Sequence, residues 1–239
     1  GKRFNANPIK REGLLFQLLT FFANWQNKKI FWALKNINLN LPAGTVLGII
    51  GKNGSGKSTL LRIIAGIYQA DEGAIQTNGE VVYLSGFSHG LMPKLTMKEN
   101  IYLIGALLGL SPKQIKEKFT EIVNFSGLND YTNAKVYQFS SGMIARLSFS
   151  ATIFYAGHKN PEIILIDEAL EAGADLEFQT KSLKKLEEFI QGGATVIIAS
   201  HQLDLLERYC HQVIWLDKGR IIKNGPPQEI IAEYIKLNQ

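Results

Sequence analysis

The stretch Gly51-Lys52-Asn53-Gly54-Ser55-Gly56-Lys57-Ser58-Thr59 decides the fold of this 239-residue chain. Residues 51–58 fit the phosphate-binding pattern GxxxxGK[ST], whose glycines let backbone N–H groups curve around phosphate oxygens. The apolar run at residues 45–50 predicts a buried strand before the loop, and a helix is predicted after it, from about residue 57 to 68. A helix N-terminus adds a favourable dipole for an anion. We therefore expect nucleotide binding at residues 51–59.

Side chains in and beyond this loop indicate the chemistry. Lys57 is expected to reach the β- and γ-phosphates, and Ser58 to offer its hydroxyl to Mg²⁺. The apolar run at residues 163–166 predicts a second buried strand, which ends in Asp167 and Glu168. An aspartate at the carboxyl end of such a strand is where a second magnesium contact belongs. Glu168 is expected to polarise a water for attack on the γ-phosphate.

The rest of the chain alternates short apolar runs with helical patterns, which predicts a layered α/β core. The strand before Asp167 is counted from Glu162, over residues 162–166, and further strands are predicted at residues 194–199 and 212–216. The pattern between residues 94 and 156 is mainly helical, and Ser111-Pro112-Lys113-Gln114 combines an N-cap, a first-turn proline and a capping-box glutamine. We interpret about residues 88–160 as an inserted helical subdomain.

The basic character of the chain is local. A hydrophobic fraction of 46% and a charged fraction of 20% exclude a disordered or collagen-like chain, and a single cysteine excludes a disulfide scaffold. The formal net charge is +5, but residues 1–35 hold seven basic residues against one acidic residue. The remaining residues therefore carry a net charge of −1. A basic patch for nucleic acid is not predicted on this body.

Residues 1–35 form a basic N-terminal segment with an amphipathic pattern inside it. Apolar side chains at residues 14, 18, 21, 22 and 25 follow helical spacing. A helix of twelve residues reaches only about 18 Å, short of the ~30 Å hydrocarbon core, so it cannot span a membrane. Two interpretations remain open: the helix docks at a membrane surface or membrane protein, or it packs on its own domain.

A third motif, Phe139-Ser140-Ser141-Gly142-Met143, resembles the signature loop of the ATP-binding cassette (ABC) ATPases, whose usual form is LSGGQ. This variant, together with residues 95–103, 144–149 and 213–221, is similar to bacterial exporters of polysaccharide, O-antigen and teichoic acid. The resemblance runs from about Phe4 to the C-terminus. It implies an α/β P-loop NTPase core of ABC type over residues 36–239, with an inserted helical subdomain and a β-rich N-terminal portion.

The resemblance also implies cofactors and partners. Ser140, Ser141, Gly142 and Met143 of one protomer are expected to close over ATP and Mg²⁺ held by residues 51–59 of a second, which gives a homodimer with interfacial ATP. His201 matches the switch histidine, which contacts the γ-phosphate and helps hold the attacking water. A membrane-embedded permease partner is implied, with the chain peripheral at the cytoplasmic face of the membrane and no nucleic acid bound.

Three departures from the family pattern leave roles open. Asp175 resembles the D-loop aspartate but follows Glu168 one residue later than the family spacing. No glutamine stands at residues 82–89, where the Q-loop glutamine belongs, so residues 85, 88 and 89 (Ser, Ser and His) are candidates for its contact. The aromatic that stacks on adenine is Phe4 or Trp32. If it is Phe4, residues 5–33 are an insertion and the first strand is expected to be missing.

These observations predict the ATP-hydrolysing subunit of an ABC exporter for a cell-surface polysaccharide or related glycan. The alternatives are an ABC ATPase of another transporter class and a soluble ABC ATPase that acts on ribosomes or nucleic acid. Against the soluble class stand a single cassette and the absence of a long coiled-coil insertion. The basic charge also surrounds an amphipathic stretch rather than a groove.

Overall fold

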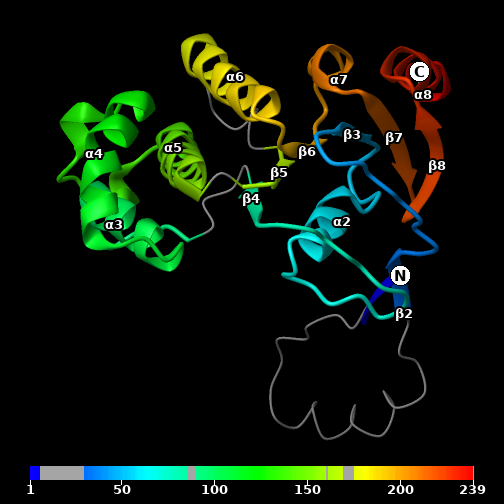
Figure 1. Cartoon of the computed structure of the whole chain (residues 1–239), viewed down its shortest axis with the longest axis horizontal. Coiled ribbons are helices and arrows are strands. Elements are labelled where there is room, and N and C mark those ends of the chain that lie inside the picture. The colour runs from blue at the N-terminus through cyan, green and yellow to red at the C-terminus, as the bar shows by residue number, and fades with distance from the viewer. Residues whose placement is uncertain (6–29, 86–89, 160, 169–174, 239) are drawn as a thin grey trace, which may run out of the picture.

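The computed structural model describes residues 1–5, 30–85, 90–159, 161–168 and 175–238. Its centre is a six-stranded sheet with the order β4-β5-β6-β3-β7-β8 (Figure 1). The strands are β3 (Val46–Ile50), β4 (Val81–Ser85), β5 (Ile163–Asp167), β6 (Thr195–Ala199), β7 (Gln212–Asp217) and β8 (Arg220–Gly225). The paired neighbours from β4 to β7 are parallel, and β8 is antiparallel to β7.

Helices lie on both faces of this sheet (Figure 1). They are α2 (Lys57–Ile64), α6 (Leu176–Gln191), α7 (Leu203–Tyr209) and α8 (Pro227–Asn238). β3 and β6 are buried at every position, as expected for continuous apolar runs in a sheet covered on both sides. α2 ends earlier than predicted, because Gly66 adopts a left-handed φ of 73° just after the last turn.

A second group of helices stands beside the sheet (Figure 1) and has a hydrophobic cluster of its own. It contains α3 (Met97–Leu107), α4 (Pro112–Ser126), α5 (Ser141–Lys159) and the short 3-10 turns Asn129–Tyr131 and Val136–Gln138. The predicted capping box at the start of α4 is confirmed: the Ser111 hydroxyl accepts from Gln114 N, and the Gln114 side chain accepts from Ser111 N. α5 connects this group to the sheet because Tyr155 packs in one cluster and Ile153 in the other.

A small antiparallel sheet joins β1 (Lys2–Asn5) to β2 (Ile30–Leu34), with Asn5 opposite Ile30. This pairing was not predicted from the sequence, and because β1 contains Phe4, the expectation that a strand before Phe4 is missing stays a prediction. A four-residue strand whose partner lies some 25 residues away leaves no local pattern that predicts it.

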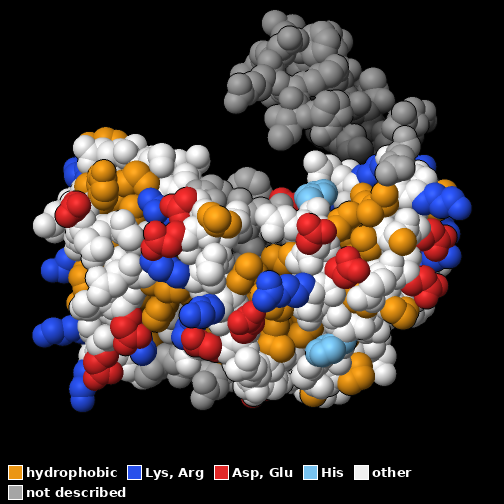
Figure 2. All heavy atoms as spheres, turned by 90° about the horizontal axis from the view of Figure 1, so that it is seen from above, with side chains coloured by type: hydrophobic (Ala, Val, Ile, Leu, Met, Phe, Trp, Pro, Cys, Tyr) orange, Lys and Arg blue, Asp and Glu red, His pale blue; other side chains and the backbone are white. Residues whose placement is uncertain are grey.

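The predicted amphipathic helix lies outside the described residues. Within the described part of the chain, no helix is long and apolar enough to cross a membrane. Figure 2 shows Lys and Arg interspersed with Asp and Glu over one face of the molecule. This mixture agrees with a body whose net charge is close to zero.

Candidate nucleotide-binding and catalytic site

Three adjacent parallel strands bring the predicted site residues to one edge of the sheet. β6 lies between β5 and β3, and Ala199 at its end pairs with Asp167 on one side and with Ile49 on the other. Because parallel strands end at the same edge, the segments that follow them meet there. These segments are the phosphate loop (residues 51–59) after β3, Glu168 after β5 and His201 after β6.

Glycine is required at two points of the phosphate loop. A Cβ atom at Gly51 would lie 2.2 Å from the Leu216 carbonyl oxygen. Gly56 has a φ of 110°, and a Cβ atom there would lie 2.8 Å from the Ala33 carbonyl oxygen. Both contacts are with backbone, which cannot move aside as a flexible side chain does. The strands around the loop thus fix its path up to the first turn of α2.

Lys57 is the buried cation of this loop, with only 5% of its surface exposed. Its ammonium donates to the carbonyl oxygens of Gly51, at 2.7 Å, and Lys52, at 3.3 Å. A buried charge is costly unless hydrogen bonds compensate it, and the loop's own carbonyls supply that compensation. Ser55 is also buried, and its hydroxyl has no hydrogen-bond partner among the described residues. The loop thus holds polar groups that suit an anionic ligand.

The imidazole of His201 reaches both of the other segments through one atom. Nε2 lies 3.1 Å from Asn53 Oδ1 in the phosphate loop and 3.3 Å from Glu168 Oε1. The Lys57 ammonium is also 3.5 Å from Nε2, at the limit of hydrogen-bond distance. With a proton on Nε2, His201 would donate toward the carboxylate of Glu168. The structure thus brings both predicted catalytic residues to the phosphate loop.

The backbone of Glu168 is strained. Its φ is 56°, a left-handed conformation that non-glycine residues adopt at a cost of about 1–2 kcal/mol. A hydrogen bond from Glu168 N to the Ala199 carbonyl, at 3.0 Å, holds this turn against β6. Strain of this kind persists where the surrounding structure imposes it, and it is frequent at functional sites. Here the turn directs the carboxylate toward His201.

Asp167 and Ser58, the predicted magnesium ligands, are in direct contact. The Ser58 hydroxyl donates to Asp167 Oδ1 at 2.9 Å, and Asp167 is only 6% exposed. Among the described residues no group of three or more His, Cys, Asp or Glu side chains could hold a metal. Mg²⁺ prefers oxygen ligands and is typically held by one or two protein groups together with substrate phosphates and water. One hydroxyl and one carboxylate beside a phosphate loop fit that ion.

Tyr83 takes part in this contact, which sequence reasoning missed. Its hydroxyl, on β4, donates to Asp167 Oδ2 at 2.7 Å. Burial, together with that hydrogen bond, raises the pKa of Tyr83 to about 12. The phenol therefore keeps its proton and remains a donor at neutral pH.

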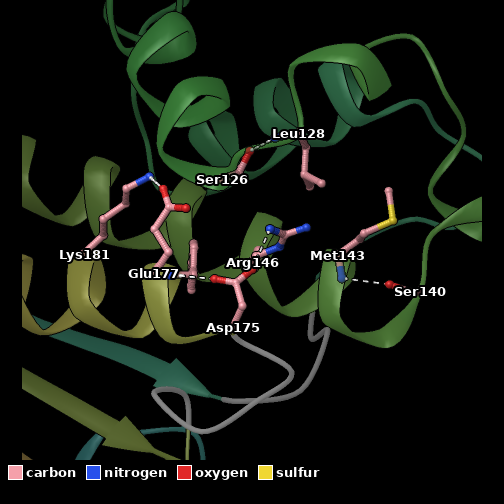
Figure 3. Close-up of polar contacts among 9 residues, drawn as sticks. Ser126, Leu128, Ser140, Met143, Arg146, Asp175, Glu177 and Lys181 are labelled. Atoms are coloured by element: carbon pink, nitrogen blue, oxygen red, sulfur yellow. Dashed lines mark hydrogen bonds and ion pairs between the residues drawn. The ribbon is translucent and has the colours of Figure 1, made fainter.

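The signature loop (residues 139–143) lies at the start of α5. Phe139 is buried, whereas Ser140 and Ser141 are exposed. The Ser140 hydroxyl accepts from Met143 N at 3.2 Å and so caps the helix that follows (Figure 3). The loop thus presents two hydroxyl side chains and a helix N-terminus to solvent.

Asp175 has a role within its own chain. It caps α6 by accepting a hydrogen bond from Phe178 N at 2.8 Å. Its carboxylate also pairs with the Arg146 guanidinium of α5 at 3.4 Å, and the two side chains point toward each other in Figure 3. The start of α6 is therefore linked to the helix that carries the signature loop.

The two candidates for adenine stacking differ in their surroundings. Phe4 is 39% exposed and packs edge-on against Tyr68, with ring centroids 5.8 Å apart. Trp32 is half-buried, and the cationic groups of Arg3 and Lys35 lie 5.8 and 5.9 Å from its ring. Lys2 Nζ also lies 5.5 Å from the centroid of the Phe4 ring, so the two rings differ in exposure and not in nearby cations. The more exposed Phe4 ring is the more available of the two for stacking.

One candidate for the Q-loop contact lies within the described residues. Ser85 ends β4 and pairs in register with Asp167, at the edge where the site residues meet. The candidates at residues 88 and 89 lie outside the described residues. Taken together, the sheet order, the glycine loop at a helix start and the carboxylate after a neighbouring strand define a P-loop nucleotide-binding domain.

Comparisons with known proteins identify the family. The ABC transporter family matches residues 34–171. Over 238 residues the chain is 39% identical to the O-antigen export system ATP-binding protein RfbB of Myxococcus xanthus, covering 98% of this chain and 53% of that protein. It is 41% identical over 238 residues to the teichoic acids export ATP-binding protein TagH of Lactococcus lactis, covering 100% and 50%. The RfbB protein of Klebsiella pneumoniae is 35% identical, with 85% and 81% covered.

Solved structures share the fold. An ATP-binding subunit of an ABC transporter aligns with a TM-score of 0.73 at 24% identity, covering 84% of this chain and 87% of that one. The dimeric cassette MJ0796, in a post-hydrolysis state with ADP and Pi, aligns with a TM-score of 0.71 at 25% identity, covering 84% and 93%. The chain belongs to the ABC transporter family, and the predicted fold is confirmed. It spans about half the length of the Myxococcus and Lactococcus relatives.

Proposed function

We propose that the chain is the ATP-hydrolysing subunit of an ABC exporter that moves a cell-surface polysaccharide or related glycan across the cytoplasmic membrane. The observation that carries the hydrolytic activity is the meeting of Glu168, His201 and Lys57 beside the Ser58–Asp167 pair. The glycan class rests on relatives named for O-antigen and teichoic acid export, which are similar over nearly the whole of this chain.

The phosphate loop would bind the β- and γ-phosphates through its N–H groups and the N-terminus of α2. Lys57 would exchange its contacts with the loop carbonyls, at 2.7 and 3.3 Å, for contacts with phosphate oxygens. Those new contacts are stronger because both partners are charged. Ser58 and Asp167 would hold Mg²⁺, which supplies charge neutralisation between the β- and γ-phosphates when bound.

Glu168 would accept a proton from the attacking water. His201 would hold that carboxylate in place through its Nε2 atom, 3.3 Å from Oε1. Because Asn53 contacts the same Nε2 atom, a change in the loop on phosphate binding reaches His201 directly. The residues that hold the nucleotide and those that activate water are thereby coupled.

The proposed active form is a homodimer with ATP at the interface. Ser140 and Ser141 are exposed in this chain and would supply hydroxyl contacts to a nucleotide bound by the other protomer. The similar cassette MJ0796 is described as dimeric, which supports this arrangement.

A membrane-embedded permease is the second proposed partner, with the chain peripheral at the cytoplasmic face of the membrane. We also propose that the basic N-terminal segment contributes to that docking. The structure offers a clean test, because Asn5 lies opposite Ile30 and the two strands can be joined by a tight Asn-Gly turn in place of residues 6–29. ATP hydrolysis is expected to persist in this variant, whereas membrane recruitment is expected to be lost. Full recruitment would assign docking to the rest of the chain.

Co-expression with the membrane protein of a neighbouring gene tests the export function. The chain is expected to sediment with membranes only when that partner is present, and surface glycan is expected to appear with the wild type but not with Glu168→Gln. Salt-dependent RNA binding without membrane recruitment would instead favour a soluble ABC ATPase. Uptake of a solute into vesicles, without glycan export, would favour an importer.

A further inference from the structure

The phenol of Tyr83 contacts the candidate magnesium site from a separate strand. Tyr83 pairs in register with Leu165, which makes Asp167 its diagonal neighbour on the same face of the sheet, within reach of an aromatic side chain. The Tyr83 hydroxyl holds Asp167 Oδ2 at 2.7 Å while Ser58 holds Oδ1 at 2.9 Å. Both oxygens of this buried carboxylate are therefore fixed, one from β4 and one from α2.

Arg62 extends this contact on the far side of the phenol. Its guanidinium donates to the Tyr68 hydroxyl oxygen at 3.5 Å, and Arg62, Tyr68 and Tyr83 line the same pocket. A guanidinium can only donate, so a cation near the phenol favours the orientation in which the Tyr83 hydroxyl directs its own proton to Asp167. A nearby positive charge also polarises the phenol O–H bond, which strengthens the donation to the carboxylate.

We propose that Tyr83 is a positioning residue that sets the orientation of the Asp167 carboxylate for binding Mg²⁺. The inference rests on the proposed function, because it requires the Ser58–Asp167 pair to take the metal. A carboxylate held at one oxygen can rotate about its Cβ–Cγ bond, and the second contact removes that freedom. Outer contacts of this kind orient metal ligands, and their loss typically costs 10–100-fold in metal affinity.

Tyr83→Phe tests this role because it removes the hydroxyl and keeps the ring. Mn²⁺ serves as the probe: free Mn²⁺ is followed by electron paramagnetic resonance during titration of the whole chain with the non-hydrolysable analogue AMP-PNP. Mn²⁺ binding is expected to weaken about tenfold, while affinity for AMP-PNP without metal stays unchanged. A purely structural role would lower thermal stability and leave Mn²⁺ affinity unaltered.

Tyr155→Phe is the matched control. It also removes a buried phenol hydroxyl, which donates to the Ile101 carbonyl at 3.1 Å inside the helical group. Its Mn²⁺ affinity is expected to equal that of the wild type. Equal affinity in Tyr83→Phe as well would overturn the inference and leave the proposed function intact. If the wild-type chain bound no Mn²⁺ with AMP-PNP, both would be overturned.

Arg62→Gln gives a second, independent variant if Tyr83→Phe folds poorly. Because Arg62 acts through the phenol, its loss is expected to weaken Mn²⁺ binding by less than Tyr83→Phe does. In the Tyr83→Phe background the same change is expected to have no further effect, since the intermediate hydroxyl is absent. Unchanged Mn²⁺ affinity in Arg62→Gln, or equal losses in both backgrounds, would contradict the proposed action of Arg62 through the phenol.

Discussion

The phosphate loop and the signature loop both lead into helices, yet different parts of the molecule hold them. Neighbouring strands hold the phosphate loop, through Asn53 to His201 and Ser58 to Asp167. The signature loop has an exposed Ser140, whose hydroxyl bonds within the first turn of its own helix. The phosphate loop is held by contacts with other strands of its own chain, whereas the signature loop presents its polar groups to solvent. We infer that each is one half of a site and that the other half comes from a second protomer.

The strongest expected effect lies in the phosphate-loop region. Glu168→Gln removes the base and keeps the surrounding contacts, so ATP turnover is expected to fall at least about 100-fold while ATP binding persists. Phosphate release and nucleotide binding measure the two quantities. Glu162→Gln, just before the opposite end of β5, is the control and is expected to hydrolyse ATP normally. Near-normal turnover in Glu168→Gln would remove Glu168 from the catalytic role.

The next effect tests the signature loop. Ser140→Ala is expected to lower turnover about tenfold, because a hydrogen bond to a charged group is worth about 1.5–3 kcal/mol. ATP affinity of the monomer is expected to stay unchanged, since that nucleotide lies on the phosphate loop. Ser111→Ala is the matched control, because it also removes an exposed helix cap. Equal losses of turnover in the two variants would show that Ser140 acts only as a helix cap and makes no contact with ATP.

A smaller effect is expected for the aromatic residue that stacks on adenine in the nucleotide-binding region. Phe4→Ala is expected to weaken ATP binding about fivefold, in line with about 1 kcal/mol for an aromatic pair. Trp32→Ala is expected to leave ATP affinity unchanged, because the Trp32 ring is less exposed than the Phe4 ring. Fluorescence titration with a labelled ATP measures both. The reverse result would assign adenine stacking to Trp32.

The smallest effect concerns the link between α5 and α6. Asp175→Ala removes the cap on Phe178 N and is expected to lower the free energy of unfolding by about 1 kcal/mol. Asp175→Asn keeps a capping oxygen and loses only the exposed pair with Arg146, which is worth at most about 1 kcal/mol and often nothing measurable. Urea unfolding compares the two variants. Equal losses would show that the ion pair, and not the cap, carries the stability.

Much of the nucleotide-binding edge could be predicted from the sequence, because each of its residues follows a recognisable apolar strand. The parallel order of β5, β6 and β3 then brings Glu168 and His201 to the phosphate loop without further information. The signature loop could be placed at a helix start for the same reason, since its polar residues precede a helical pattern.

The features that could not be predicted depend on contacts between distant segments. The sequence around Tyr83 predicts only a strand. Its contact with Asp167, 84 residues later, depends on the register of β4 against β5, which the sequence does not reveal. β1 escaped prediction because its partner strand follows a long intervening segment. The left-handed turn at Glu168 is held by a hydrogen bond to β6, so the local sequence preference of Glu168 does not predict it.

Mixed dimers test the complementarity of the two loops most directly. In a Glu168→Gln background, one chain carries Lys57→Ala, which damages the phosphate loop, and the other carries Ser140→Arg, which blocks the signature loop. If each site combines the two loops from different protomers, neither variant alone is expected to form a dimer that keeps ATP bound during gel filtration. An equal mixture is then predicted to retain ATP at one intact site in each mixed dimer. A mixture that retains no more ATP than the separate variants would contradict the account.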